Sequence, residues 1–341
     1  MGGLATTPEA RTLRVKALAE SIGFDACGVA PTAAGEGFLR YLRAVEAGYT
    51  ADMRWLHEEP GLRADVREVW AEARSVIVVA VNYGDPTVPN ARDVPAADDE
   101  VLIARYAQGR DYHLHVKPMM VRFARALATD RAFGPPGDSR DHRVFVDTGP
   151  VLEKHFAHLA GVGWIGKNSL LIRKHGGSWC FLGVVLTPLE LAPDTPHTDH
   201  CGTCTRCLDA CPTGAFPEPY VLDARKCIAT WTIESPSPAA VIDPESIGPH
   251  AFGCDVCQEV CPWNRKPLMT QHPHLRPRPE NVRPKLAELA ALAAVDDETL
   301  RARFPRSAVR RVTASQMRET LEVIAASRAR RGSDSAVNKG P

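Results

Sequence analysis

No apolar run in this chain is long enough to cross a membrane. The longest aliphatic stretch covers residues 289–295, whereas a spanning helix needs about 18 or more apolar residues. The first residues also lack a basic segment, an apolar segment and a twin-arginine pair. The sequence therefore predicts neither export nor membrane anchoring, and we expect a cytoplasmic protein.

A net charge is also missing, because 41 Lys and Arg balance 41 Asp and Glu. The charges are unevenly spread. Residues 262–341 hold 16 basic and 8 acidic residues, or +8, which leaves 25 basic and 33 acidic residues, or −8, in the first 261. A basic C-terminal quarter on an acidic body indicates a region that faces a polyanion, and the alternative is a solvated helical face.

What is present is an ordinary globular balance, with 44% apolar and 24% charged residues, which excludes a disordered or fibrous protein. Apolar residues at 15, 18, 19 and 22 repeat with a helical period, and Gly23 suits the left-handed residue that ends a helix. The β-branched run at 76–81 predicts a strand buried on both faces. Further predicted helices cover 37–47, 114–129 and 150–159, and further predicted strands cover 24–30, 143–146, 169–174 and 180–187.

Interspersed strands and helices up to residue 187 predict one α/β domain. We expect a cysteine-rich domain at 188–267, which begins with a proline-rich linker. A basic helical region is expected at 268–328, and a disordered tail at 329–341.

Eight of the ten cysteines fall between residues 201 and 261. An even count is compatible with disulfides, but disulfide frameworks are typical of small secreted chains. Reduced thiolates that hold metal are therefore favoured here. The two remaining cysteines, Cys27 and Cys180, are interpreted as small buried apolar residues.

The cysteine spacing is that of bacterial two-cluster ferredoxins. The first run, CxxCxxCxxxCP, is complete, and the second lacks its first member, which Cys227 supplies across an insertion. In such runs three neighbouring thiolates hold one 4Fe–4S cluster, and the fourth, before the proline, reaches the other cluster. The predicted ligands of cluster 1 are Cys201, Cys204, Cys207 and Cys261, and those of cluster 2 are Cys211, Cys227, Cys254 and Cys257.

Four-thiolate zinc sites are the alternative, because they also use Cys-x2-Cys pairs. Zinc motifs normally pair two such knuckles and do not contain the longer ferredoxin run. Two clusters in series indicate a relay of single electrons, and the roughly 200 residues before them are expected to hold the acceptor.

Three segments of the α/β part resemble signatures of the epoxyqueuosine reductases. They are RYAQGRDYH at 105–113, VDTGPVLEK at 146–154 and GVGWIGKNSLLI at 161–172. The resemblance covers about residues 10–310. It implies an α/β (α+β) cobalamin-binding domain resembling nitroreductases, followed by a two-cluster ferredoxin domain and a short helical C-terminus. Members of this family reduce epoxyqueuosine to queuosine at the wobble position of tRNA.

The resemblance gives Asp147 the role of proton donor to the epoxide oxygen, for which it should be protonated and desolvated. The alternative is that Asp147 caps a helix opened by Pro150. Tyr106 and Tyr112 are candidates for the substrate pocket. His113 is a candidate catalytic acid or cobalt ligand, but it is interpreted as a satisfied structural histidine, because cobalamin in this family takes no lower histidine ligand from the protein.

The resemblance also implies contacts to cobalamin. The residues implied are Arg63, Ala107, Lys167, Asn168 and Leu171. The alternative for Arg63 is a surface ion pair, and the alternative for 166–169 is a turn favoured by Gly and Asn. Arg310 and Arg311 are the expected tRNA contacts, although the Arg-Asn pair common in this segment of the family is missing.

The sequence is thus expected to encode an epoxyqueuosine reductase with cobalamin and two 4Fe–4S clusters as cofactors. We expect a monomer that binds tRNA and takes electrons from an external low-potential donor, with no membrane partner. Two alternatives stay open: a reductive dehalogenase-like cobalamin enzyme, and an iron–sulfur electron carrier that serves a partner enzyme.

Overall fold

The computed structural model describes residues 7–337, and the side chains of residues 7–331. A four-stranded antiparallel sheet forms its centre, in the order β1-β2-β7-β4. The strands are β1 (Ala26–Ala30), β2 (Ser75–Asn82), β7 (Cys180–Thr187) and β4 (Arg143–Phe145). Every residue of β2 is buried, so the strand predicted at 76–81 is confirmed.

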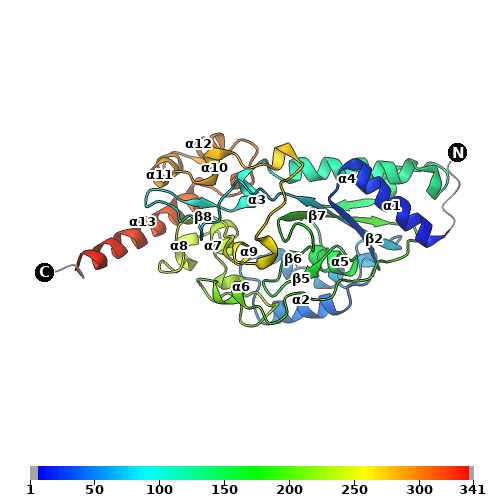
Figure 1. Cartoon of the computed structure of the whole chain (residues 1–341), viewed down its shortest axis with the longest axis horizontal. Helices are drawn as coiled ribbons and strands as arrows, with labels where there is room; N and C mark the ends of the chain where they lie inside the picture. Colours follow the sequence, from blue (N-terminus) through cyan, green and yellow to red (C-terminus); the bar gives the residue numbers. More distant parts are fainter. Residues whose placement is uncertain (1–6, 338–341) are drawn as a thin grey trace.

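Helices cover both faces of this sheet (Figure 1). Helices α1 (Pro8–Ile22) and α4 (His113–Thr129) cover one face, and α5 (Glu153–Leu159) covers the other. A further helix, α2, covers Glu36–Glu46. Ile77 and Val79 point toward α1 and α4, and Val76 and Val78 toward α5, because side chains alternate along a strand. Full burial of each such side chain contributes about 1.5–3 kcal/mol.

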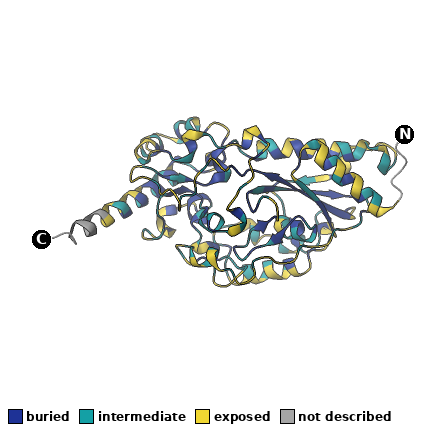
Figure 2. Ribbon diagram, in the orientation of Figure 1, coloured by how far each residue is buried: buried dark blue, intermediate teal, exposed yellow. Residues whose placement is uncertain are grey.

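A separate hydrophobic cluster unites the C-terminal helices, and Figure 2 colours buried residues dark blue. Its helices are α7 (Ile228–Ile233), α11 (Leu286–Ala293), α12 (Asp297–Arg303) and α13 (Ala314–Val337). It also contains Val101, Ile103 and Ala107, because β3 (Leu102–Ile103) pairs in parallel with β8 (His250–Phe252). The hydrophobic cores therefore do not separate at residue 187, where the sequence places a boundary.

The cysteine helices α6 (Arg206–Asp209) and α9 (Val256–Glu259) contact each other in the middle of the molecule (Figure 1). A two-stranded hairpin, β5 (Trp164–Ile165) and β6 (Leu171–Ile172), lies nearby. The remaining short helices are α3 (Arg105–Gln108), α8 (Pro238–Val241) and α10 (Pro279–Val282).

Two predicted boundaries are wrong. Helix α5 begins at Glu153 and not at Pro150, because the backbone at Leu152, with φ −81° and ψ +69°, lies outside the helical region. Helix α13 continues through Val337, so the tail predicted to be disordered from 329 is helical that far. Residues 338–341 lie outside the described part. None of the described helices is long and apolar enough to cross a membrane.

Candidate active site

Asp147 lies on the loop between β4 and α5, and its side chain is 52% exposed. The Tyr112 hydroxyl donates a 2.6 Å hydrogen bond to its Oδ2. The residue before α5 is Leu152, and no side chain caps this helix. Asp147 is therefore not a helix cap, which removes the structural alternative to its proposed role.

We expected Asp147 to be desolvated, but the neighbouring carboxyl of Glu153 is the desolvated one. The Asp147 backbone N–H donates to Glu153 Oε1 at 2.7 Å. Burial, followed by the negative charge of Asp147, raises the pKa of Glu153 to about 7. The structure thus places an exposed carboxyl beside one that holds its proton near neutral pH.

His113 adjoins the same carboxylate. Asp111 Oδ1 lies 2.9 Å from His113 Nδ1, and the imidazole stacks on Tyr112 with ring centroids 4.1 Å apart. His113 Nε2 lies 3.9 Å from Asp147 Oδ2 and has no hydrogen-bond partner among the described residues. Asp111 therefore orients an imidazole whose free nitrogen lies close to Asp147.

A pocket of about 300 Å³ opens beside these residues. It is lined by Tyr106, Asp111, Tyr112, His113, Ser307, Ala308, Arg310 and Arg311. The two tyrosines and the two arginines predicted from the sequence thus lie in one pocket. The arginines come from a 3-10 helix, Ala308–Arg311, and Arg311 also forms a 3.0 Å ion pair with Glu234. Sequence reasoning missed Asp111 as the residue that orients the His113 imidazole. The signal for it was the position of Asp111 two residues before His113.

The loop at 166–170 connects this region to the cysteines. Lys167 Nζ donates to the Gly202 carbonyl at 2.7 Å, and Asn168 Nδ2 donates to the Cys257 carbonyl at 3.3 Å. Lys154, which follows Glu153, donates to the Ser169 carbonyl at 3.0 Å. The loop therefore lies between the Asp147 segment and the cysteine-rich segment.

The other residues implied as cobalamin contacts are engaged within the protein. Arg63 is buried and donates to the Trp55 and Glu58 carbonyls at 2.8 and 3.3 Å, so it is not a surface ion pair. The Ala107 carbonyl accepts from the Ser307 hydroxyl at 2.8 Å. Leu171 is buried in β6.

One group of neighbouring thiols contains Cys201, Cys204, Cys207 and Cys261. Burial and, to a smaller extent, the charges of Cys261 and Cys201 raise the pKa of Cys207 to about 11. Burial also raises the pKa of Cys261, and the neighbouring charges of Cys201 and Cys204 add to this. Cys261, the last cysteine of the second run, thus lies beside three cysteines of the first run.

A second group contains Cys211, Cys227, Cys254 and Cys257. Burial raises the pKa of Cys254, and the charges of Cys227 and Cys211 contribute. The pKa of Cys257 is raised by burial and then by Cys254 and Cys227. These are the neighbours that the crossed ferredoxin arrangement requires.

All ten cysteines are free thiols. Within residues 7–331, no three Cys, His, Asp or Glu side chains are placed to hold a single metal ion. Burial raises the pKa of Cys27 to about 12 and also raises that of Cys180, as expected for inert thiols.

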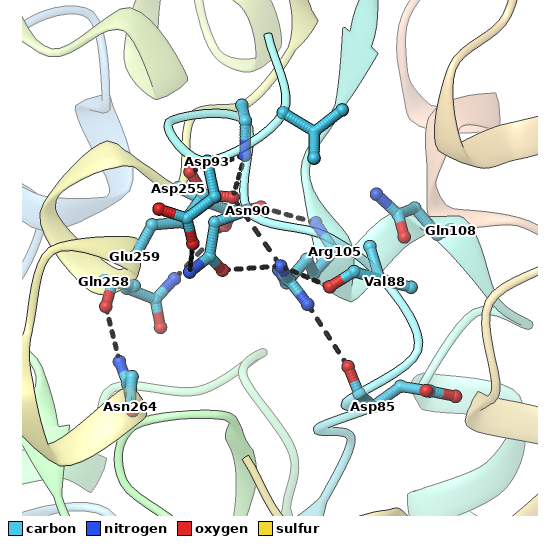
Figure 3. Close-up of polar contacts among 12 residues, drawn as sticks. Asp85, Val88, Asn90, Asp93, Arg105, Gln108, Asp255, Gln258, Glu259 and Asn264 are labelled. Carbon is cyan, nitrogen blue, oxygen red and sulfur yellow. Dashed lines mark hydrogen bonds and ion pairs between the residues drawn. The ribbon is translucent and has the colours of Figure 1, made fainter. Parts of the chain in front are cut away.

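A buried polar network ties α9 to the α/β part (Figure 3). The Arg105 backbone N–H donates to Asp255 Oδ2 at 2.7 Å, and its guanidinium lies 3.7 Å from Glu259 Oε1. The same guanidinium donates to Asn90 Oδ1 and to the Val88 carbonyl at 2.8 and 3.0 Å. Removing one partner of a buried ion pair typically costs 3–5 kcal/mol, so this network fixes α9 and its Cys257 relative to α3.

Comparisons with known proteins agree with this arrangement. Residues 200–264 match a 4Fe-4S double cluster binding domain, and residues 63–148 match a family described as epoxyqueuosine reductase QueG, DUF1730. An epoxyqueuosine reductase of Synechocystis sp. is 39% identical over 86% of this chain and 98% of its own length. One of Gloeobacter violaceus is 41% identical over 89% and 92%.

Solved structures give the same answer. A crystal structure of epoxyqueuosine reductase with an epoxyqueuosine-modified tRNA-Tyr stem loop matches with a TM-score of 0.78 and 26% identity, over 93% of this chain and 81% of that chain. A structure from Bacillus subtilis, with an aspartate catalytic loop swung out of the active site, matches to the same extent.

Proposed function

The chain belongs to the epoxyqueuosine reductase family, and from that premise we propose how its residues reduce epoxyqueuosine to queuosine in tRNA. The protein is an oxidoreductase whose cysteine-rich segment is a double 4Fe–4S cluster domain. The observation that supports the proposal most is that the loop at 166–170 accepts a hydrogen bond from Lys154, in the Asp147 segment, and donates hydrogen bonds to both cysteine segments.

In this proposal the two groups of thiols hold the two clusters. Cys201, Cys204, Cys207 and Cys261 hold one, and Cys211, Cys227, Cys254 and Cys257 hold the other. The second group lies nearer the substrate, because the charges of Cys257 and Cys227 act on Lys154, next to Glu153. Electrons from an external low-potential donor therefore enter at the first cluster and leave from the second.

In this proposal cobalamin would bind beside the loop at 166–170, between the second cluster and the pocket. Lys167 and Asn168 lie on the loop that joins Cys257 to Lys154, where an acceptor between cluster and substrate has to bind. Leu171 gives this loop a buried anchor, while Arg63 and Ala107 act through the segments that they brace. When bound, cobalamin supplies the cobalt centre that passes electrons to the substrate.

Conversion of the epoxide to the alkene takes up two electrons and two protons and releases one water. Asp147 supplies a proton to the epoxide oxygen as the C–O bonds break. The Tyr112 hydroxyl holds its carboxyl in place. Tyr106 and Tyr112 form the wall against which the unstacked base lies, and Arg310 and Arg311 meet the RNA phosphates.

The test is anaerobic reconstitution with iron, sulfide and cobalamin, followed by an assay on tRNA from cells that accumulate epoxyqueuosine. Formation of queuosine supports the proposal. A protein that takes up both clusters and passes electrons to a partner, but binds no cobalamin and leaves the tRNA unchanged, would be a carrier and would contradict it.

A further inference from the structure

A basic surface lies directly beside the first thiol group. We define the basic patch as the exposed side chains of Lys174, His175, Arg265 and Lys266 around Leu268 and Met269. A hollow of about 340 Å³ lies within it, and no acidic residue lines this hollow. Its residues come from the turn after β6 and from the segment that follows Cys261-Pro262.

These two segments are held together firmly. Asn264 Oδ1 accepts from the Ser178 backbone N–H at 2.8 Å, and Asn264 Nδ2 donates to Ser178 Oγ at 2.8 Å. Gly177 has φ +65°, and a Cβ there would lie 1.9 Å from Asn264 Oδ1. Only glycine permits this approach, so the basic patch is a built surface and not two independent loops.

The cations of the basic patch are uncompensated. Within the described residues, the side chains of Lys174, Arg265 and Lys266 form no ion pair or hydrogen bond, unlike those of Arg67, Arg140 and Arg225 elsewhere on the surface. Leu268 and Met269 between them are 51% and 41% exposed. An apolar centre with a rim of one charge sign is typical of a surface that receives a protein of opposite charge.

Aromatic rings connect the basic patch to the first thiol group. Trp263, which lines the hollow, lies 4.8 Å from the ring of the buried Trp164. Trp164 in turn lies 4.8 Å from the ring of His200, which immediately precedes Cys201. A protein bound at the basic patch would therefore sit beside both Cys201 and Cys261.

We propose that the basic patch is the docking surface for an acidic electron-carrier protein, which reduces the cluster held by Cys201, Cys204, Cys207 and Cys261. In each encounter the carrier loses one electron and the cluster gains one, and no atoms are transferred. The inference rests on the proposed function only for the presence of that cluster.

A larger groove of about 1300 Å³ also adjoins the cysteine helices, but it fits an acidic partner less well. Its lining mixes three acidic residues, Asp98, Asp209 and Glu259, with four arginines, so it does not present one sign of charge. Its Arg328 already donates to the Asp98 and Glu100 carbonyls. The basic patch has no such carboxylates and no such internal bonds.

The experiment measures cluster reduction in anaerobic protein that holds both clusters, without tRNA. The bleaching of cluster absorbance is followed by stopped flow after mixing with an acidic flavodoxin in its hydroquinone form, and separately with dithionite. The test variant is Arg265→Glu with Lys266→Glu. The matched control is Arg122→Glu with Arg125→Glu, which reverses two exposed charges on α4 and alters net charge equally.

We expect the patch variant to lower the second-order rate constant with flavodoxin at least about tenfold at low salt, since electrostatic steering raises association rates by 10–10³-fold. This difference should shrink at high salt. The control variant should react at the wild-type rate within about twofold. Reduction by dithionite and affinity for tRNA should be unchanged in both variants.

Equal flavodoxin rates in the patch and control variants would overturn the proposal. A loss of tRNA affinity with normal flavodoxin rates would also overturn it and assign the basic patch to RNA. If the substitutions at 265 and 266 damage the cluster, which slow dithionite reduction would reveal, Lys174→Glu with His175→Glu makes the same test from the other segment. The experiment does not measure tRNA turnover. Its outcome can therefore be interpreted even if the protein does not reduce epoxyqueuosine.

Discussion

Asp147 and Ser169 adopt left-handed backbone conformations, with φ +62° and +59°, on the two loops that border the candidate site. Non-glycine residues in this region cost free energy and persist where the surroundings hold them. Tyr112 holds the Asp147 side chain, and Lys154 holds the Ser169 carbonyl. In both loops, contacts from neighbouring side chains therefore hold a backbone conformation that costs free energy.

Replacement of Asp147 by Asn separates proton transfer from structure. Asn tolerates a left-handed backbone and can accept the hydrogen bond from Tyr112, but it cannot transfer a proton. We expect Asp147→Asn to fold and to retain both clusters while turnover on tRNA falls by about two to four orders of magnitude. Rates of queuosine formation, with iron content as the control for folding, test this, and near-normal turnover would exclude a catalytic Asp147.

Glu153 makes stability depend on pH. An ordinary Glu ionises near pH 4.5, whereas burial and Asp147 raise the pKa of Glu153 to about 7. Between these values the unfolded chain has released a proton that the folded chain keeps, so the folded state loses stability as pH rises from about 4.5 to about 7.

Glu153→Gln should remove this pH-dependent loss of stability, because glutamine does not ionise. Measured by thermal unfolding of anaerobic protein, the difference in stability between variant and wild type should move in favour of the variant across that range, by about 1–3 kcal/mol. A difference that does not change between pH 5 and pH 8 would mean that Glu153 titrates normally.

At the scale of elements, the long segments could be predicted and the short ones could not. The apolar run at 76–81 and the periodic pattern at 114–129 lie within β2 and α4, because burial along a whole strand or helix leaves a pattern in the sequence. Strands β3 and β8 have two and three residues and pair across about 150 positions. No local pattern specifies such a pairing.

The start of α5 was missed for a related reason. Pro150 is compatible with a first helical turn, but the Asp147 N–H is bonded to Glu153 and the chain turns before the helix begins. A proline restricts its own φ angle, but it does not determine which carboxylate accepts a hydrogen bond from a nearby backbone N–H. Pro150 alone therefore could not locate the start of the helix. The cysteine spacing, in contrast, is local and carries its geometry with it.

The crossed arrangement of the cysteine helices can be tested directly. Cys211 follows α6, yet its thiol lies with Cys227 and Cys254. Anaerobic wild-type protein should contain about eight iron and eight sulfide, and Cys211→Ala should lose mainly the cluster that depends on Cys254 and Cys257. Electron paramagnetic resonance of the reduced protein distinguishes the clusters, and selective loss of the Cys201–Cys207 cluster would contradict the crossing.

At the scale of the whole molecule, the basic C-terminal quarter contributes Arg310 and Arg311 to the lining of the pocket. Affinity for the tRNA should fall with salt, with a log–log slope of about 0.7–0.9 for each phosphate neutralised. Arg310→Ala with Arg311→Ala should reduce that slope by one to two such units. Glu234→Gln, which frees Arg311 from its ion pair, is the control, and it should not weaken binding.

The pocket is completed late in synthesis. The Asp111 N–H is bonded to the Arg306 carbonyl at 2.6 Å, and the Asn82 carbonyl accepts from the Thr270 hydroxyl at 2.6 Å. On the ribosome, the sheet and all eight cluster cysteines emerge before the segment that closes over Tyr112 and His113. The ligands of both clusters are therefore synthesised before the residues that complete the substrate pocket.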